Sequence, residues 1–390
     1  MKIRSLHEAG DLKNKKVLLR VDFNVPLNET NEVADNSRIK AALPTINYLK
    51  EQGAKIIILT HLGRPAGAVV PKFSTKVLTE ALEKLLNFKV IHLDNIPSPA
   101  ELEKALAESS VVMLENVRFY LGEEKNDLDF AKQLAVLGEI YVNDAFSVSH
   151  RAHASVEALA RLLPAYAGFQ LAKEVENLSK VLESPARPKV AIIGGAKLDT
   201  KVKVIKNLLK TAEAVLVGGA IANNFFKAKG LEVGLSKVDD KELATAKELL
   251  TEKKLIIPVD VVVAPDFTVQ AAAEVKLIDE VGPADIILDL GLEAVKQYAE
   301  IIKSAKLVVW NGPLGYFEVA KYKQASGDIA QAIVASGAYS VAGGGETVQL
   351  INELGLADKF NFVSMSGGAM LEFLEGKMLP GIKPLIEQNG

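Results

Sequence analysis

Short apolar runs rich in β-branched residues alternate with helix-like segments along nearly the whole chain. Helix-like periodicity occurs over Ser74–Asn87, Ala100–Ala107 and Lys241–Leu250, among other segments. The strand-like runs are KVLLRV, AKIIILT, SVVML and EIYVN in the first part of the chain, and KVAIIGG, EAVLVGG, KLIIPVDVVVA, KLVVWNG, YSVAGGG and FNFVSMS in the second. Such alternation is typical of β-α-β units, in which helices cover parallel strands on both faces. We therefore predict an α/β fold of doubly wound parallel sheets.

The pattern also predicts a domain boundary near the middle of the chain. At 390 residues the chain is too long for one ordinary core, and two domains are expected. A helical stretch around Gln170–Leu182 is followed by Ser184-Pro185-Ala186-Arg187-Pro188, where two prolines end the helix. We predict a first domain over residues 1–169, a linking helix and hinge over 170–187, and a second domain over 188–371.

Composition and charge exclude several classes of function. The 49% apolar and 24% charged residues are typical of a globular protein. A net charge of −3 and a pI near 6.1 argue against nucleic-acid partners and against an anionic membrane surface. The absence of cysteine excludes disulfides, zinc-thiolate sites and a thiol nucleophile. The charged start MKIRSLHEAGDLKNKK lacks the apolar segment of a signal peptide, so we expect a cytoplasmic protein.

The two halves of the chain differ in the chemistry that they can supply. Every arginine and every histidine lies at or before Arg187, whereas most of the 28 glycines follow it. Arginine forks bind carboxylates and phosphates in a bidentate manner. Glycine-rich turns between a strand and a helix expose backbone N–H groups to phosphates. The division indicates one half that binds an anionic substrate and another that binds a nucleotide.

In the first half, arginines and histidines follow four successive predicted strands. They occur in RVDFNVP with the later Arg38, in THLGRP, in ENVRF and in NDAFSVSHRAHAS. Ligands of open α/β sheets bind beyond the carboxyl ends of the strands, so these side chains predict a basic pocket for a small anion. Arg20 lies inside an apolar strand, and we expect it to be a buried structural partner rather than a ligand contact.

In the second half, three glycine-rich turns follow predicted strands. GGAKLDTK, starting at Gly194, opens a helix and carries two lysines, but it lacks the spacing of a Walker A loop. GGGET, starting at Gly343, precedes another helix, and its carboxylate could hold Mg²⁺. WNGPLGYFE, starting at Trp310, is the third. Together the turns predict a site for nucleotide phosphates.

The segments RVDFNVP, THLGRP, ENVRF, NDAFSVSHRAHAS and GGAKLDTK, in this order, resemble the phosphoglycerate kinase family, and the resemblance covers essentially the whole chain. It implies reversible transfer of the acyl phosphoryl group of 1,3-bisphosphoglycerate to ADP, giving 3-phosphoglycerate and ATP, with Mg²⁺ as cofactor. It also implies a monomer, hinge bending between the domains, and a C-terminal segment, about 372–390, that returns to the first domain.

The resemblance further implies roles for individual residues. The implied phosphoglycerate-binding residues are Asp22, Asn24, Arg38, His61, Leu62, Gly63, Arg64, Arg118 and Arg151. The implied nucleotide-binding residues are Gly194, Lys197, Lys201, Asn311, Gly312, Glu318, Gly343, Gly344, Gly345, Glu346 and Thr347, with Glu346 also the metal ligand. Arg38, Lys197 and Gly345 are the implied catalytic residues. A phosphoglycerate carboxylate is already ionised at neutral pH, so the reaction needs no general base.

Several positions depart from the family pattern. Glu346 stands where the family usually has Asp, and we expect it to bind Mg²⁺ with altered geometry. Ser366 replaces a glycine, so a positive φ at this position would be strained, and Met365 replaces a hydroxyl-bearing residue. Leu292 replaces a usual Pro and Asn224 a usual Thr.

Two alternatives to an active kinase remain open at this point. A catalytically silent member of the family is compatible with the altered GGGET and SMSGGA loops. An NAD-dependent dehydrogenase shares the α/β alternation, but no G-x-G-x-x-G turn follows the first predicted strand.

Overall fold

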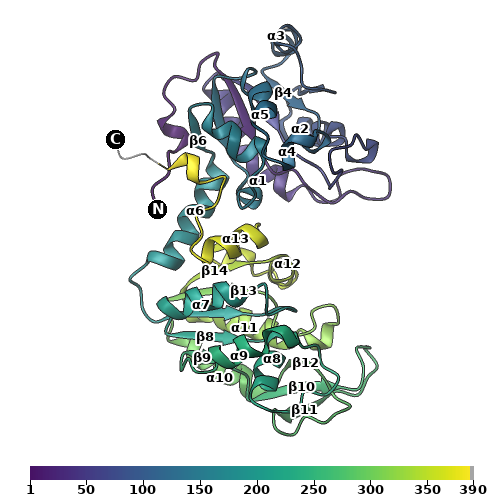
Figure 1. Cartoon of the computed structure of the whole chain (residues 1–390), viewed down its shortest axis with the longest axis vertical. Helices are drawn as coiled ribbons and strands as arrows, with labels where there is room; N and C mark the ends of the chain where they lie inside the picture. The colour runs from purple at the N-terminus through teal and green to yellow at the C-terminus, as the bar shows by residue number, and fades with distance from the viewer. Residues whose placement is uncertain (387–390) are drawn as a thin grey trace. The chain divides into compact units, whose positions relative to one another are not determined.

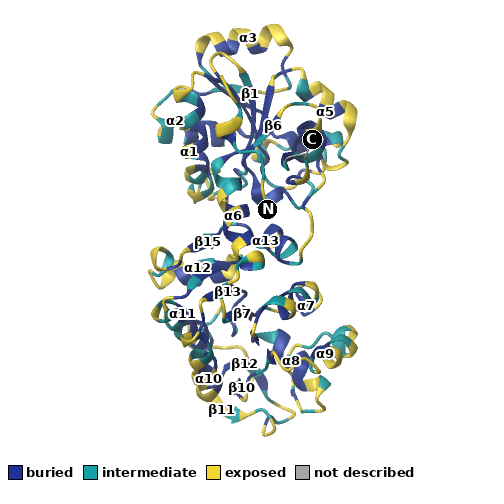
Figure 2. Ribbon diagram, turned by 90° about the vertical axis from the view of Figure 1, so that its left-hand side faces the viewer, coloured by how far each residue is buried: buried dark blue, intermediate teal, exposed yellow. Residues whose placement is uncertain are grey.

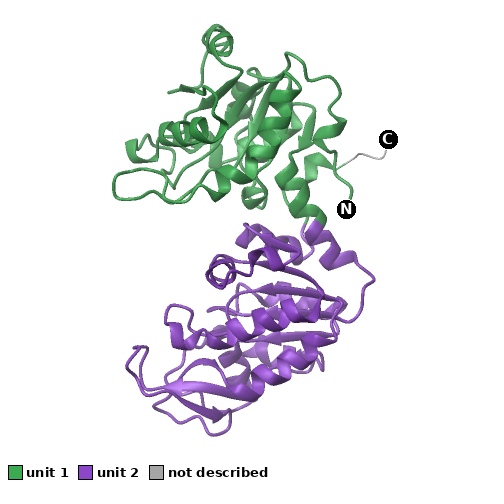
Figure 3. Ribbon diagram, turned by 180° about the vertical axis from the view of Figure 1, so that it is seen from behind, with its two compact units in different colours: residues 1–176, 378–390 green, residues 177–377 purple. Residues whose placement is uncertain are grey.

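A computed structural model of the chain describes residues 1–386. The chain forms two compact units, drawn in different colours in Figure 3. Unit 1 comprises residues 1–176 and 378–390, and unit 2 comprises residues 177–377. The last four positions of the predicted returning segment, 387–390, lie outside the described residues.

Unit 1 is built on one six-stranded parallel sheet, as predicted for this half of the chain. The strand order is β3-β4-β2-β1-β5-β6. The strands are β1 (Lys16–Arg20), β2 (Lys55–Leu59), β3 (Ile91–Leu93), β4 (Val111–Leu114), β5 (Ile140–Asn143) and β6 (Ala165–Ala167). In the register of the central strands, Arg20 lies opposite both Leu59 and Asn143, so the strands end together. The loops that follow β4, β2, β1 and β5 therefore meet at one edge.

The helices of unit 1 connect these strands (Figure 1). They are α1 (Ser37–Glu51), α2 (Lys76–Leu86), α3 (Pro99–Glu108), α4 (Leu121–Glu124), α5 (Leu128–Ala135) and the start of α6 (Phe169–Glu183), with single turns η1 (Leu6–Glu8), η2 (Pro71–Phe73), η3 (Val117–Phe119), η4 (Phe146–Val148), η5 (Ala154–Ala158), η6 (Leu159–Arg161) and η10 (Lys383–Leu385). Local chemistry sets the start of α3: Ser98 and Glu101 form a capping box, and Pro99 occupies the first turn.

Unit 2 contains a second six-stranded parallel sheet. Its order is β15-β14-β13-β7-β8-β9. The strands are β7 (Lys189–Ile193), β8 (Ala214–Val217), β9 (Leu255–Ile256), β13 (Leu307–Asn311), β14 (Tyr339–Gly343) and β15 (Phe362–Ser364). The ends of β7, β13 and β14 are again in register, since Asn311 pairs with Ile193 and with Gly343.

Unit 2 also has a small antiparallel sheet that the sequence pattern did not predict. It consists of β10 (Asp260–Ala264), β11 (Glu274–Leu277) and β12 (Ile286–Leu290), in the order β11-β10-β12. The run KLIIPVDVVVA, interpreted as one strand, is divided between β9 of the parallel sheet and β10 of this sheet. Pro258 lies between the two strands and lacks the N–H that a continuous ladder requires.

The helices of unit 2 connect its strands in the same β-α-β manner. They are the end of α6, α7 (Val202–Thr211), α8 (Ala220–Ala228), α9 (Leu243–Leu249), α10 (Leu292–Lys303), α11 (Gln324–Ser336), α12 (Gly345–Glu353) and α13 (Gly367–Leu374), with single turns η7 (Asp240–Glu242), η8 (Ala320–Tyr322) and η9 (Ala357–Lys359). Within residues 1–386, no helix combines the length and apolarity needed to cross a membrane.

Each unit has its own apolar core. One cluster in unit 1 gathers around β1, β2 and β4, and one in unit 2 around β7, β13 and β14. Figure 2 shows the strands in the dark blue of buried residues and the outer faces of helices such as α3 and α10 in yellow. Strands buried on both faces read as continuous apolar runs, which explains why the sequence pattern located them.

The C-terminal segment returns to unit 1, but it does so from Met378 rather than from about residue 372, because 372–377 belongs to α13 and the turn after it in unit 2. Arg4 N donates to Leu385 O at 2.8 Å, and Ile3 pairs with Ile386 in an antiparallel bridge. Gly381 is held on both sides: its N–H donates to Ser149 O, and its carbonyl accepts from Asn143 Nδ2, each at 2.9 Å.

Replacing Gly381 by Ala should destabilise unit 1. A Cβ at this position would lie 2.7 Å from Val156 Cγ1 and 2.9 Å from Ser149 Cα. Such overpacking costs about 1–3 kcal/mol in free energy of unfolding. Urea denaturation followed by circular dichroism measures the loss. The matched control is Gly327→Ala in α11, where the nearest atom would be 3.9 Å away, and it should leave stability unchanged or raised. Equal effects of the two substitutions would contradict the prediction.

Candidate active site

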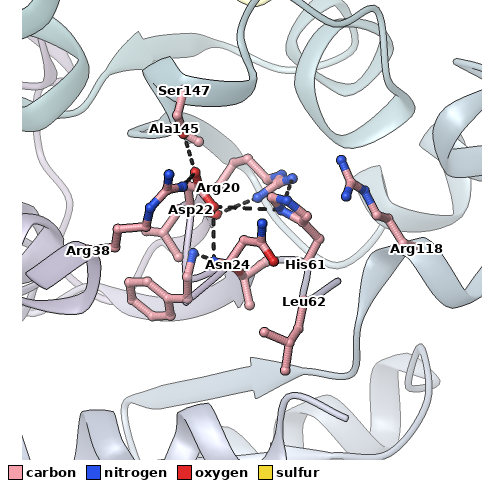
Figure 4. A network of polar contacts seen from close by, with 12 residues as sticks. Arg20, Asp22, Asn24, Arg38, His61, Leu62, Arg118, Ala145 and Ser147 are labelled. Atoms are coloured by element: carbon pink, nitrogen blue, oxygen red, sulfur yellow. Dashed lines mark hydrogen bonds and ion pairs between the residues drawn. The ribbon is translucent and has the colours of Figure 1, made fainter. Parts of the chain in front are cut away.

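At the carboxyl edge of the unit 1 sheet, three loops and the start of α1 bring polar side chains together. Asp22 and Asn24 follow β1, His61 follows β2, and Arg118 follows β4, while Arg38 comes from the first turn of α1. In Figure 4 the guanidinium groups of Arg38 and Arg118 lie on opposite sides of Asp22 and His61. These side chains were predicted to share one site, and in the structure they form one cluster.

Asp22 is the centre of this cluster. Its carboxylate accepts hydrogen bonds from Arg38 Nη1 and from the hydroxyl of Ser147, and it accepts from Asn24 N at 3.0 Å. His61 Nδ1 lies 3.9 Å from its other oxygen. Burial alone would raise the pKa of Asp22, but the charge of Arg38 and the hydrogen bonds from Ser147 and from Asn24 N hold it below its ordinary value. The aspartate is therefore ionised and fixes Arg38 at the edge of the sheet.

Arg20 lies behind this cluster, and the prediction that it is a buried structural partner is confirmed. It is fully buried, and Nη2 lies 3.2 Å from His61 Nδ1. A guanidinium can only donate, so His61 Nδ1 accepts and its proton is assigned to Nε2. Burial lowers the pKa of His61 well below its ordinary value. His61 is therefore a neutral hydrogen-bond donor at neutral pH.

A buried carboxylate balances the charge of Arg20. Arg20 Nε donates to Ser155 Oγ at 2.8 Å, and Ser155 donates to Glu123 through Oγ at 2.6 Å and through N at 2.9 Å. Glu123 is fully buried. Glu123 and Ser155, together with Ser147, support the site but were not predicted. Ser147 lies within the NDAFSVSHRAHAS segment, whereas nothing in GEEK distinguishes Glu123 from the neighbouring glutamate.

Backbone contacts hold the THLGRP loop. Asn24 Oδ1 accepts from Gly63 N, and Arg118 Nη1 donates to Gly63 O, each at 2.8 Å. Asn116 Nδ2 donates to Leu62 O at 2.7 Å. Arg64, at the end of this loop, is exposed and has no hydrogen bond or ion pair with another residue of 1–386. The structure thus joins Leu62 and Gly63 to the cluster but leaves the Arg64 side chain apart from it.

Positive charge is concentrated at the carboxyl edge of the unit 1 sheet. Burial, with the neighbouring Arg20 and Arg151, lowers the pKa of Arg118 to about 10, and Glu124 opposes that shift. Arg20, Arg38, Arg118 and Arg151 outnumber the carboxylates around them, which are Asp22, Glu123 and the Glu124 that pairs with Arg118 Nε at 3.3 Å. An anionic ligand would relieve the remaining positive charge.

At the carboxyl edge of the unit 2 sheet, the main feature is close contact between backbone segments rather than a cluster of charged side chains. Gly194 and Gly312 lie against each other: a Cβ on Gly194 would be 2.0 Å from Pro313 O, and one on Gly312 would be 2.2 Å from Gly194 O. Gly343 packs against Met370 so closely that a Cβ would lie 2.2 Å from its sulfur. Only glycine allows the ends of β7 and β13 to meet in this way, and Gly343 leaves room for the Met370 side chain.

Asn311 links these strand ends. Its Oδ1 accepts from Lys201 Nζ at 2.5 Å, and its Nδ2 donates to Gly343 O at 2.9 Å. Thr347 Oγ1 accepts from Gly312 N at 2.9 Å. Burial lowers the pKa of Lys201 to about 8, and the Glu346 carboxylate opposes that shift. Lys201 is thus a largely protonated cation with a fixed position.

Two adjoining pockets open beside these groups. One is polar, and its lining includes Lys197, Thr200, Lys201, Asn311, Gly312, Gly344, Gly345, Glu346 and Thr347. The other is mainly apolar, and its lining includes Gly219, Ala222, Asn223, Phe226, Leu288, Leu290, Leu314, Phe317 and Glu318. Gly195, Ala196 and Glu346 line both. The apolar pocket was not predicted, because its residues come from α8, β12 and the loop after β13 and carry no charge pattern.

The structure shows the conformation or the contacts of three positions that depart from the family pattern. Ser366 has φ −125° and ψ 87°, so the expected strain from a positive φ is wrong. Leu292 is the first residue of α10, a position where proline and leucine are interchangeable. Asn224 is buried and pairs with the Asp239 backbone through both amide atoms.

Glu346 lies exposed at the start of α12, beside Gly344 and Gly345. No group of three or more His, Cys, Asp or Glu residues able to hold a metal occurs in the part of the chain that the structure describes. One carboxylate suits Mg²⁺ when substrate phosphates and waters supply the remaining ligands. The residues present therefore fit a metal that arrives with a nucleotide.

Comparison with known proteins identifies the chain. The sequence model of the phosphoglycerate kinase family matches residues 6–377. The chain belongs to the phosphoglycerate kinase family. It is 45% identical to phosphoglycerate kinase of Coprothermobacter proteolyticus over the full length of both chains. It is also 45% identical to that of Moorella thermoacetica, over 97% of this chain and 98% of the relative.

Solved structures of phosphoglycerate kinases have the same fold. The Coxiella burnetii structure superposes with a TM-score of 0.90 at 40% identity, covering 98% of this chain and 99% of the other. The Pyrococcus horikoshii structure gives a TM-score of 0.84 at 32% identity, covering 98% of each chain. The chain is an enzyme of glycolysis that transfers a phosphoryl group between 1,3-bisphosphoglycerate and ADP, with Mg²⁺ as cofactor. The dehydrogenase alternative is wrong.

His153, whose Nδ1 lies 3.8 Å from Glu123 in unit 1, should contribute to loss of stability in acid. Burial lowers its pKa to about 3, and Arg118 adds to the effect. The unfolded chain binds a proton below about pH 6.5, while the folded chain does not, so stability is complete above pH 6.5 and falls as the pH drops toward 3.

His153→Gln should remove this dependence. Between pH 7.5 and pH 5, the variant should lose up to about 2 kcal/mol less free energy of unfolding than the wild type. Urea denaturation at the two pH values gives the comparison. Parallel losses in both proteins would show that His153 does not titrate in this manner.

Proposed function

We propose that unit 1 is the phosphoglycerate-binding domain and unit 2 the nucleotide-binding domain. The predicted domain ranges are 1–169 with about 372–390, and 188–371, whereas the compact units are 1–176 with 378–390, and 177–377. The observation that carries the proposal is the difference between the two sheet edges. One presents a cluster of arginines held by Asp22, and the other presents glycine turns and two lysines. A sugar acid with a phosphate and a carboxylate suits the first, and a nucleotide suits the second.

In unit 1, the proposed phosphoglycerate contacts are the predicted residues. Arg38, Arg118 and Arg151 would supply positive charge, and His61 would donate from Nε2. Asp22 and Asn24 would orient these donors, since one holds Arg38 and the other holds the Gly63 backbone. Arg64 is exposed and available to an incoming anion.

In unit 2, we place the nucleotide phosphates in the polar pocket. Lys197 and Lys201 would neutralise them, and Gly343–Gly345 would offer backbone N–H groups at the start of α12. The base would occupy the apolar pocket, where Phe226 and Leu314 are among the lining residues. Glu318 lines that pocket and is placed to accept from the ribose hydroxyls.

During transfer, the protein mainly positions the reactants and balances charge. We assign Arg38, Lys197 and the N–H groups around Gly345 to the charge on the moving phosphoryl group. Bound Mg²⁺, held by Glu346 and the nucleotide phosphates, would supply further charge neutralisation. The attacking carboxylate is ionised already, so no residue is needed as a base. Because the two ligands are assigned to different units, they must approach, and segment 170–187 is the predicted hinge.

Lys197→Ala should lower turnover far more than it weakens nucleotide binding. A single cationic contact to this kind of transition state is worth about 10³-fold in rate. The assay couples 3-phosphoglycerate, Mg²⁺ and ATP to a dehydrogenase, and calorimetry gives the dissociation constant of ADP. Lys203→Ala, an exposed lysine on α7 outside the pocket lining, is the control and should retain activity. Equal losses of turnover and affinity in Lys197→Ala would refute the assignment.

Glu346→Gln should raise the Mg²⁺ concentration required for half-maximal activity by about tenfold or more, because the side chain keeps its size but loses the charge that attracts the ion. Glu346→Asp restores the usual family residue and should remain within about threefold of the wild type. Titration of activity with Mg²⁺ at fixed nucleotide gives both values. An unchanged requirement in Glu346→Gln would rule out Glu346 as the metal ligand.

We also propose that the enzyme acts as a monomer in the cytoplasm. Every residue assigned to a ligand belongs to the same chain, so no partner copy is needed to complete either site. Sedimentation velocity should give a single species near the chain mass of 41.9 kDa.

A further inference from the structure

The loop between β10 and β11 supplies part of the wall of the apolar pocket in unit 2. Residues 265–273 join the two strands (Figure 1). From this loop, Phe267 lines the pocket, and its ring packs against the ring of Tyr316, another lining residue, with the ring centroids 5.2 Å apart. The position of the loop therefore decides whether this part of the wall is present.

The loop is exposed and is shaped mainly by its own hydrogen bonds. Residues 265–270 are all exposed, and Phe267 keeps 48% of its surface accessible. Asp266 Oδ1 accepts from Thr268 N at 2.7 Å and from Thr268 Oγ1 at 2.5 Å. These bonds form a turn but do not attach it to the rest of unit 2. An exposed loop with internal bonds alone would open easily.

Lys321 attaches the loop to the rest of unit 2. It lies in η8, after β13, and its Nζ donates to Val269 O at 2.7 Å and to Ala271 O at 2.6 Å. Beyond the pairing of β10 with β11, the described part of the chain makes one other hydrogen bond to the loop, from Tyr322 Oη to Thr268 O at 3.4 Å. The polar attachment of the loop therefore depends mainly on Lys321.

The surroundings of Lys321 fix the course of its side chain. Its ammonium lies 4.7 Å from the centroid of the Tyr322 ring, and Tyr322 is fully buried. Within residues 1–386, both hydrogen bonds of Lys321 go to the loop and none to a carboxylate. By contrast, Lys303 on α10 pairs with Glu300 at the surface. A charged donor to a carbonyl makes a stronger hydrogen bond than a neutral donor, so two such bonds hold the loop in one place.

We propose that Lys321 is a positioning residue for nucleotide binding, because it holds the 265–273 loop where Phe267 forms part of the wall of the base pocket. The proposal rests on the base site proposed for unit 2. Lys321 lines neither the apolar nor the polar pocket, so it acts through the loop and not by touching the nucleotide. A wall that is already in place spares the ligand the conformational cost of ordering the loop.

The first test is Lys321→Met, which keeps the length of the side chain and removes its donors. The dissociation constant of ADP, measured by calorimetry, should rise by about three- to tenfold. KM for 3-phosphoglycerate should remain within about twofold, since its proposed contacts lie in unit 1. An unchanged dissociation constant of ADP would overturn the proposal.

Two matched variants accompany this measurement. Lys321→Arg keeps a cation that can donate to two carbonyls, so its affinity for ADP should stay within about twofold of the wild type. Lys303→Met removes the same charge from an exposed position on α10 and should leave the affinity unchanged. An equal loss of affinity in Lys303→Met and Lys321→Met would show a general effect of charge and would overturn the proposal.

A double-mutant cycle tests whether Lys321 acts through Phe267. Phe267→Ala removes the wall and should weaken ADP binding by about three- to tenfold. Adding Lys321→Met to Phe267→Ala should then weaken binding little further, because the loop no longer carries the side chain that Lys321 positions. Losses that multiply in the double variant would show that Lys321 acts independently of Phe267, contrary to the proposal.

Proteolysis gives a readout that does not depend on activity. Chymotrypsin cleaves after exposed phenylalanines, and cleavage after Phe267 in the ligand-free protein should be about fivefold or more faster in Lys321→Met than in the wild type. Lys303→Met should be cleaved at the wild-type rate. Equal rates of cleavage after Phe267 in all three proteins would show that Lys321 does not hold the loop.

Phe267→Ala also separates this proposal from the base site itself. If this variant binds ADP as tightly as the wild type, the base does not lie against Phe267, and the proposed base site fails together with the role of Lys321. If Phe267→Ala weakens ADP binding while Lys321→Met keeps the wild-type affinity, only the role of Lys321 has failed.

Discussion

Parallel strand pairing is the constraint on which the rest of this molecule depends. In each unit, six strands run in one direction, and the central ones end in register. The loops that leave those ends must therefore meet at one edge, however far apart they are in sequence. The Asp22 cluster and the Gly194–Gly312 contact are both products of this arrangement. The same pairing buries both faces of the strands, so it accounts for the apolar runs that make the sheets recognisable.

The carboxyl edges of the two parallel sheets differ in their electrostatics. Unit 1 confines several guanidinium groups, and it compensates with carboxylates at two depths: Asp22 at the edge and Glu123 behind Arg20. Arg20 also fixes the tautomer of His61, because its Nη2 can only donate to Nδ1. Unit 2 supplies few charged side chains and relies on backbone N–H groups. These groups need no carboxylate to balance them, but glycine is required wherever two backbone segments touch. The uneven distribution of arginine and glycine along the sequence follows from this difference.

Glu346 shows how such a site tolerates change. It is exposed at the first turn of a helix whose backbone is set by Gly343 and Gly344, so one added methylene meets no packed neighbour. Ser366 has a negative φ, so a side chain there meets no left-handed strain. Neither departure removes a cation or a glycine that the strand ends require. The family activity and these substitutions are therefore compatible in physical terms.

The sequence by itself determined the α/β class, the strand runs of both parallel sheets and the loops that carry the chemistry, because buried strands and glycine turns have strong local signatures. It also indicated that Arg20 is structural, since a charge inside an apolar strand needs a buried partner. Only the tertiary structure decided what that partner is, because Glu123 and Ser155 reach Arg20 through packing between distant segments. It likewise revealed the antiparallel sheet, because the direction in which strands pair is not part of their local pattern, and the apolar pocket of unit 2, whose residues come from distant segments.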